Sequence, residues 1–228
     1  SEMCIRDSTY RDSVIDLSDL QASKLNIFAE AYKINDKVIG LPMYGFNEFV
    51  YYRKSIFKEL GLKEPTTWGE FLNVVKVLKT KNDCIPLAIG AKDLWVTYPY
   101  GQFTSYLVNG GDDILNKMGE IKNPFQEGSP VYNGYKKVNE LFSLKPAGDN
   151  PLGYGWSQAT NMFLSKKAAM LAAGQWYYKS YMEEAPEADK SDLGMFLMPI
   201  RDNKDEKFRY FVTGEVLSLI HISEPTRP

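Results

Sequence analysis

The sequence predicts an α/β fold, and three features of its middle region indicate this class. A β-branched and aromatic run ends near residue 54. Apolar side chains then recur at helical spacing over residues 67–78, and a short apolar run bounded by turn residues follows at 85–90. Strands that alternate with amphipathic helices in this way are typical of a layered α/β body.

Caps and turn residues place the boundaries of the expected elements. Gly61 ends a short helix, because glycine readily follows a helix C-terminus. Thr67, with Glu70 three residues later, has the spacing of a capping box and begins the next helix. Ser157 can cap a later helix, and the uncharged apolar run 168–174 predicts a central strand despite its alanines. The expected helices cover residues 29–33, 54–60, 67–78, 99–109, 131–142, 157–165 and 176–182, and the expected strands cover residues 38–40, 85–90, 168–174 and 193–198.

The lead-in and one turn complete the first part of the chain. Residues 10–20 are polar and irregular, and Ser18 and Asp19 are able to cap a short helical turn. Asn35 and Asp36 predict a tight turn before the first strand. We find no internal repeat and no low-complexity segment.

Residues 39–54 are the segment around which the chain is organised. The segment begins with turn residues, has Gly45 near its middle and ends in aromatic residues. An extended segment with a central glycine can leave one packed layer and enter another. We interpret it as a crossover between two lobes, and the alternative is a single interior strand with a bulge at Gly45.

The composition is that of an ordinary globular protein and excludes several function classes. Of the 228 residues, 44% are hydrophobic and 25% are charged. The net charge of −2 favours neither nucleic acid nor an anionic membrane surface as a partner. No apolar run approaches the roughly 20 residues of a membrane-spanning helix. The aromatic content of 14% favours ligands with flat apolar faces, although most such rings fill cores.

Cysteine and histidine are scarce. Cys84 is expected to be a buried small apolar residue. Cys4 and His221 lie in terminal segments that are set aside below. Without histidine, the rest of the chain cannot form Ser-His-Asp or Cys-His catalytic groups or most zinc sites. We therefore predict no catalytic residues, no metal, no cofactor and no disulfide.

Both ends of the chain resemble translated adapter DNA. Residues 3–8 and 217–227 look like the translation of a transposase adapter that is used in sequencing libraries. We exclude residues 1–8, as a leader, and residues 217–228, as a tail, from the fold prediction. We expect the chain to be an internal piece of a longer protein.

Three stretches of the native part form a specific combination. They are Gly40 to Lys54 with Leu60 to Leu62 and Pro65 to Trp68, then Phe163 to Trp176, then Leu193 to Pro199 with Thr213 and Gly214. In order and spacing, over residues 35–216, the combination resembles the extracellular solute-binding proteins of carbohydrate ABC importers. This family is related to maltose-binding protein.

The resemblance implies a two-lobed fold of the periplasmic-binding-protein kind, type II, with the ligand between two α/β lobes. On this map, residues 9–46 are a remnant of the N-terminal lobe and the first hinge crossing. Residues 47–211 are the C-terminal lobe, and residues 212–216 are the return crossing. Gly45 and Gly214 are the expected hinge residues.

The resemblance also implies a sugar site of aromatic and polar residues. A pyranose has apolar faces that stack on rings, and its hydroxyls need donors and acceptors. Trp176 matches the stacking tryptophan of the family, and Trp95 lies where the family often has another aromatic residue. Tyr44 and Asn47, at the crossover, could bond hydroxyls. Further ligand-binding candidates are Trp156 and Gln175. Each candidate could instead serve packing or backbone hydrogen bonding. We assign Trp68 to packing at the start of its helix and not to the ligand.

The implied function is that of a non-catalytic receptor. Hinge closure around a mono- or oligosaccharide would present a docking surface to the permease of an ABC transporter. We expect a monomer outside the cytoplasm, either periplasmic or lipid-anchored. One alternative is a carbohydrate-active hydrolase, for which the candidate carboxylates are Glu48, Asp93 and Glu215. Otherwise Glu48 is expected to be a solvated charge. The other alternative is an adhesive or structural module.

Overall fold

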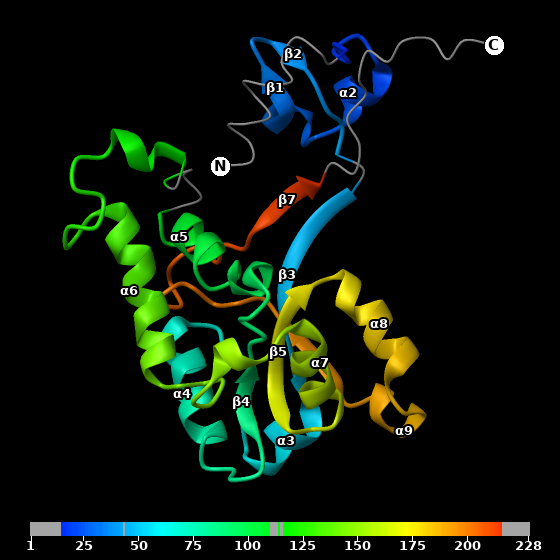
Figure 1. Cartoon of the computed structure of the whole chain (residues 1–228), viewed down its shortest axis with the longest axis vertical. Helices are drawn as coiled ribbons and strands as arrows, with labels where there is room; N and C mark the ends of the chain where they lie inside the picture. Colours follow the sequence, from blue (N-terminus) through cyan, green and yellow to red (C-terminus); the bar gives the residue numbers. More distant parts are fainter. Residues whose placement is uncertain (1–14, 43, 110–113, 115, 216–228) are drawn as a thin grey trace. The chain divides into compact units, whose positions relative to one another are not determined.

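The computed structural model (Figure 1) describes residues 15–42, 44–109, 114 and 116–215. The chain divides into two compact units. The first unit holds residues 1–46 and 212–228, and the second holds residues 47–211. The predicted leader and tail, with Cys4 and His221, lie outside the described residues.

The first unit contains short elements. They are α2 (Gln21–Leu25), the 3-10 helix η1 (Ala29–Tyr32), β1 (Lys33–Ile34), β2 (Lys37–Val38) and β7 (Val212–Glu215). β1 and β2 pair antiparallel across the predicted turn, where Asn35 and Asp36 have φ angles of 48° and 65°. The cap expected from Ser18 or Asp19 is wrong, because α2 begins after Leu20 without a side-chain cap. Ser18 instead accepts a hydrogen bond from the Val38 N–H at 3.0 Å.

The second unit contains most of a mixed sheet and its covering helices. Its elements are β3 (Tyr44–Arg53), α3 (Lys54–Glu59), α4 (Trp68–Leu78), β4 (Ile85–Ala88), η2 (Leu94–Thr97), α5 (Gln102–Val108), η3 (Asn116–Glu120), α6 (Pro130–Ser143), η4 (Pro151–Gly153), α7 (Trp156–Leu164), β5 (Ala168–Gly174), α8 (Trp176–Glu184), α9 (Glu187–Lys190) and β6 (Leu193–Phe196). The strand order is β4-β5-β3-β6, and β7 also pairs with β3. β4 and β5 are parallel, whereas β3 is antiparallel to β5 and β6. β3 is one continuous strand whose first residues belong to the first unit.

Helices cover both faces of this sheet, as Figure 1 shows. Val50 and Tyr52 of β3 pack in one core with α3, α4 and Leu141 of α6. Tyr51, between them in sequence, packs in a second core with α7 and α8. Successive strand residues therefore enter opposite cores, as expected for a sheet that is buried on both faces. Every residue of β5 is buried, which confirms the predicted central strand.

A buried arginine anchors the end of β3. The Arg53 side chain is fully buried, and its guanidinium forms ion pairs with Asp192 at 2.9 Å and Asp189 at 3.3 Å. Arg53 Nη1 also donates a hydrogen bond to the Tyr181 hydroxyl. Lys166 pairs with Asp189 at 2.8 Å and, with its neighbours, keeps the pKa of that carboxyl below its usual value. These contacts fix β3 to α8, α9 and the start of β6.

Several elements differ from the prediction at their ends. α7 begins at Trp156, with Gly155 as its N-cap, so the cap expected from Ser157 is wrong. The Gln158 side chain accepts the Gly155 N–H at 2.8 Å and closes this helix end. The helix expected over residues 99–109 is shortened to α5, because residues 98–101 form turns. Trp68 is buried as predicted, and its indole N–H donates to Glu140 at 2.8 Å. No helix in the described ranges is long and apolar enough to cross a membrane.

Candidate ligand-binding site

Three tryptophans from separate elements meet at one place in the second unit, and we call them the tryptophan cluster. The ring centroids lie 5.0 Å apart for Trp95 and Trp156, 5.2 Å for Trp156 and Trp176, and 5.9 Å for Trp95 and Trp176. Trp95 and Trp176 are 40% and 39% exposed, whereas Trp156 is partly buried between them and the core. The rings are tilted at 50° to 61° to one another, so they do not cover each other's faces. The cluster therefore presents aromatic surface on which an apolar ligand face can stack.

The sheet topology brings Trp95 and Trp176 together. β4 and β5 are parallel neighbours, and so their carboxyl ends lie at the same edge of the sheet. The segment after β4 carries Trp95, and β5 is followed directly by Gln175 and Trp176. Open α/β sheets bind ligands at this edge.

A close approach of two loops adds Trp156 to the cluster. A Cβ at Gly90 would lie 2.4 Å from the backbone of Gly155, so only glycine allows the loops to come so close. Asp93 Oδ2 accepts the Trp156 N–H at 2.7 Å. A carboxylate is favourable there, at the amino end of a helix. Asp93 thus ties the loop that carries Trp95 to the helix that begins with Trp156.

Tyr177 supports the cluster from the core. Its ring meets Trp156 edge to face at a centroid distance of 5.6 Å and lies 6.3 Å from Trp176. The Tyr177 hydroxyl is buried and has no hydrogen-bond partner in the described part of the chain. Burial raises the pKa of this phenol above its ordinary value. The hydroxyl therefore stays neutral, and the ring serves as packing beneath the two indoles.

Asn47 and Gln175 bind each other beside Trp176. The Asn47 N–H donates to Gln175 Oε1 at 2.6 Å, and the Gln175 N–H donates to the Asn47 carbonyl at 3.0 Å. Asn47 Oδ1 is buried and lacks a hydrogen-bond partner among the described groups. An acceptor left in this state costs about 1–3 kcal/mol. Asn47 therefore has an unused acceptor, and its backbone is bonded to Gln175, the residue before Trp176.

The structure places the other three predicted residues in the first unit. Tyr44 is exposed and opens β3, and Gly214 lies in β7. Gly45 lies against Phe28, where a Cβ would be 3.3 Å from the ring. Of the six predicted ligand-binding residues, the second unit thus brings together the three tryptophans, Asn47 and Gln175.

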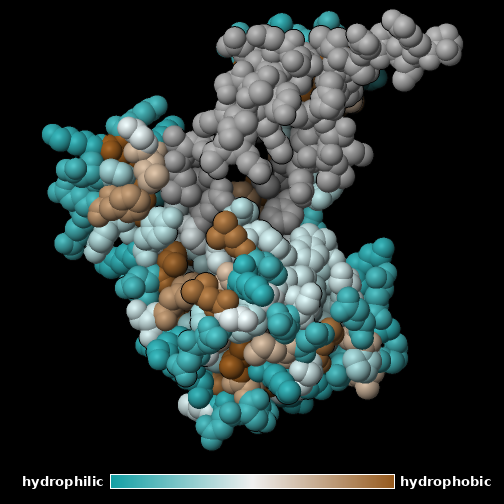
Figure 2. All heavy atoms as spheres, in the orientation of Figure 1, coloured by the Kyte–Doolittle hydropathy of each residue, from teal (hydrophilic) through white to brown (hydrophobic). Residues whose placement is uncertain are grey.

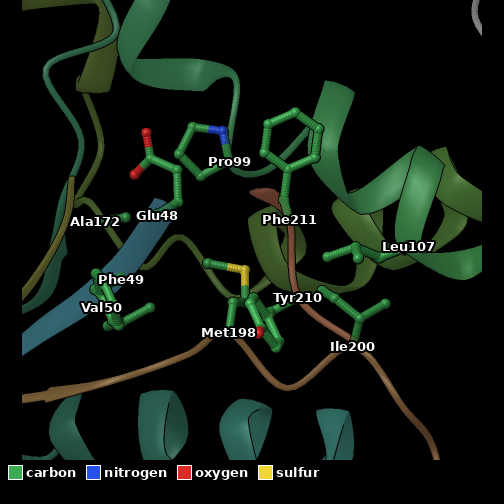
Figure 3. Close-up of a pocket in the computed structure, with 10 residues that line it drawn as sticks. All are labelled: Glu48, Phe49, Val50, Pro99, Leu107, Ala172, Met198, Ile200, Tyr210 and Phe211. Atoms are coloured by element: carbon green, nitrogen blue, oxygen red, sulfur yellow. The ribbon is translucent and has the colours of Figure 1, made fainter. Parts of the chain in front are cut away.

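Glu48 is not the solvated charge that we expected. Its Oε2 is buried without a hydrogen-bond partner within the described residues, and burial raises its pKa to about 8. Figure 3 shows its side chain rising from β3 into a pocket with Pro99 and Phe211, which we call the Glu48 pocket. The other residues that line it are Phe49, Val50, Leu107, Ala172, Met198, Ile200 and Tyr210.

The three carboxylates considered for hydrolysis differ in their positions and partners. Glu48 and Asn47 are successive strand residues, so Glu48 points away from the face that carries Asn47. Asp93 is engaged at the start of α7, and Glu215 ends β7 in the first unit. Among the described residues, no three His, Cys, Asp or Glu side chains gather closely enough to hold a metal ion.

Apolar side chains are scattered on the face of the second unit that Figure 2 shows. Figure 2 shows hydrophilic side chains over most of the visible face, with hydrophobic side chains in small separate patches. Tryptophan and tyrosine have intermediate hydropathy and so do not stand out in this colouring.

Comparison with known proteins assigns the chain to a class. Residues 8–218 match the family described as bacterial extracellular solute-binding protein. The chain belongs to this family. The resemblance read from the sequence is thereby confirmed, and so is the α/β fold of type II periplasmic binding proteins.

Individual relatives are sugar-binding proteins. The chain is 29% identical over 177 residues to the multiple sugar-binding protein of Streptococcus mutans. The matched region covers 76% of this chain and 41% of that protein. It is 24% identical over 194 residues to the diacetylchitobiose binding protein DasA of Streptomyces coelicolor, with coverages of 81% and 43%. The chain thus spans about two-fifths of the length of these curated relatives.

Solved structures agree in fold. RafE from Streptococcus pneumoniae, in its apo form, superimposes with a TM-score of 0.73 at 27% identity, covering 91% of this chain and 53% of that chain. RafE in complex with raffinose gives a TM-score of 0.76 at 26% identity, with coverages of 94% and 56%.

Proposed function

We propose that this chain forms one side of the sugar site of an extracellular receptor, which delivers a mono- or oligosaccharide to the permease of an ABC transporter. The observation that carries the proposal is the tryptophan cluster. Two partly exposed indoles stand at the carboxyl edge of the parallel strands β4 and β5, and a third indole and a buried tyrosine pack against them. Rings held in this way lose little conformational freedom when a sugar stacks on them.

The chemistry of the site suits a neutral polyol. Trp176 and Trp95 stack on the apolar faces of sugar rings, and Trp156 holds them in place. Asn47 Oδ1, which has no hydrogen-bond partner among the described groups, accepts a hydrogen bond from a sugar hydroxyl. Gln175 fixes the backbone of Asn47, and Tyr44 contributes a further polar contact.

The relatives support a receptor rather than a hydrolase. The family is one of solute-binding proteins, and the names of two curated relatives refer to sugars. A related chain of known structure binds raffinose. Within the second unit, Asp93 is engaged by the Trp156 N–H and the Glu48 carboxyl is buried on β3, so neither is presented as a free carboxylate beside the tryptophan cluster.

The proposal extends to the whole receptor. Residues 9–46 and 212–216 belong to an N-terminal lobe and its two crossings, and residues 47–211 form the C-terminal lobe. Gly45 and Gly214 act as hinge residues, so that ligand binding is coupled to closure. The receptor is a monomer that is periplasmic or held at the cell surface by a lipid anchor.

Truncation of one indole tests the site. In the full-length protein that contains this chain, Trp176→Ala should weaken saccharide binding by about 1–3 kcal/mol, the scale for loss of a packed aromatic anchor. Calorimetry with a panel of mono- and oligosaccharides measures the loss. Tyr178→Ala is the matched control, because Tyr178 is an exposed aromatic residue on the same helix and is not part of the cluster. Unchanged affinity in Trp176→Ala would assign this residue to packing, and no binding of any saccharide by the wild type would refute the proposal.

A further inference from the structure

A second aromatic feature of the second unit lies beside η2, and we call it the tyrosine hollow. It encloses about 430 Å³. Tyr98, Tyr100 and Gly101 line it from the turn between η2 and α5. Tyr135, Val138 and Phe142, at the helical spacing of one face of α6, line the other side.

The hollow is built from flat rings and neutral polar groups. Tyr98 and Tyr135 are 43% and 45% exposed, and the Phe125 ring lies 6.2 Å from the Tyr135 ring, so each tyrosine keeps part of its surface accessible to a ligand. Beneath them Tyr100 meets Phe142 edge to face at 5.8 Å, which fixes the floor. None of the described residues that line it carries a charge. Such a surface offers stacking faces and phenolic hydroxyls to a neutral sugar, and no counter-charge to an ionic ligand.

The tyrosine hollow is next to the tryptophan cluster along the chain, because η2 carries Trp95 and is followed directly by Tyr98. The Tyr98 N–H donates to the Trp95 carbonyl at 3.2 Å, which closes one turn of 3-10 helix. Side chains three residues apart eclipse on such a helix, and the rise of one turn is about 6 Å. Trp95 and Tyr98 therefore project on the same side, separated by about the length of one pyranose ring.

We propose that the tyrosine hollow extends the sugar site and takes the further rings of a neutral oligosaccharide. The proposed ligand class is thus a linear oligosaccharide, and a monosaccharide fills the tryptophan cluster alone. This inference rests on the proposed function, because it assumes that the cluster binds sugar.

The test compares ligands of graded length on single variants. Calorimetry on the full-length protein uses galactose, raffinose and stachyose, and in parallel N-acetylglucosamine with its dimer and tetramer. We expect affinity to rise with length in the series that binds. Tyr98→Ala and Tyr135→Ala should each weaken the longest saccharide about three- to tenfold. The shortest ligand that binds should change by less than a factor of two.

Three controls separate the two proposals. Tyr178 is 48% exposed on α8 and lines no part of the hollow, so Tyr178→Ala should leave all affinities unchanged. Tyr135→Leu keeps apolar bulk without a stacking face, so it should show the same loss of affinity with an unchanged unfolding transition if stacking, and not folding, accounts for the loss. If Trp176→Ala weakens every saccharide while the tyrosine variants bind long and short ligands like the wild type, the extension is overturned and the receptor stands. If the wild type binds none of the saccharides, both proposals fall.

Discussion

Glu48 is a carboxyl held where its ionised form is unfavourable. Its pKa lies near 8 in the folded chain, against an ordinary value of 4.5, and burial is the cause. The folded state therefore binds this proton more tightly than the unfolded state does. The resulting stability is fully present below about pH 4.5 and is lost as the pH rises through about 8.

The Glu48→Gln variant should remove this pH dependence. Between pH 5 and 8 the wild type should lose stability relative to the variant, at up to about 1.4 kcal/mol per pH unit and less where water reaches the side chain. Urea unfolding across this range measures the difference. Glu183→Gln, an exposed carboxyl on α8, should run parallel to the wild type. Parallel curves for the wild type and Glu48→Gln would show that the Glu48 carboxyl is already ionised in the folded chain.

The joint between η2 and α7 is the element-scale feature on which the site depends. Asp93 precedes η2 and accepts the first N–H of α7, so one carboxylate holds two of the three tryptophans. Asp93→Ala should cost about 0.5–2 kcal/mol of unfolding free energy, as for a lost helix cap. It should also change the near-ultraviolet circular dichroism of the cluster and weaken saccharide binding.

Two variants distinguish positioning from general stability. Asp93→Asn keeps an acceptor at the helix end and should restore much of the dichroism and binding. Asp149→Ala removes an exposed carboxylate whose ion pair with Lys145 spans 2.9 Å, and it should alter neither. If Asp93→Ala lowers stability while the dichroism and affinity stay as in the wild type, Asp93 is a helix cap and does not position the indoles.

Sequence patterns predicted those elements whose signals are local. β5 is short, uncharged and ended by glycine, and the structure buries all of it. Thr67 accepts the Glu70 N–H at 3.3 Å, as the capping-box spacing predicts. The start of α7 was misplaced because its cap comes from Gly155 and from Asp93 of a distant loop, and a non-local acceptor leaves no signal at Ser157.

The site was only partly predictable for the same reason. The sequence supplies Trp95, Trp156 and Trp176 as separate candidates, but their meeting depends on the parallel pairing of β4 with β5. It depends also on the contact of Gly90 with Gly155. Both are tertiary contacts between segments that lie far apart in the sequence, so no local sequence pattern indicates them. Glu48 likewise shares a pocket with Pro99 and Phe211, which come from distant parts of the chain.

At the scale of the whole molecule, the chain passes between its two units twice, after Phe46 and after Phe211. All three rings of the tryptophan cluster and all residues of the tyrosine hollow belong to the second unit. The chain also spans only about two-fifths of its curated relatives. On our proposal, therefore, the second unit supplies one face of the sugar site and the rest of the receptor supplies the other.

A comparison of this 228-residue chain with the full-length protein tests that division. Binding sites for small ligands usually bury about 70–90% of the ligand surface, and a single open face buries less. The chain alone should therefore bind the preferred saccharide at least about tenfold more weakly, or about 1.4 kcal/mol. Trp176→Ala should weaken both proteins, since the cluster contributes to each. Equal affinity of the chain and the full-length protein would mean that the second unit holds the entire site, and the two-lobe map would have to be abandoned.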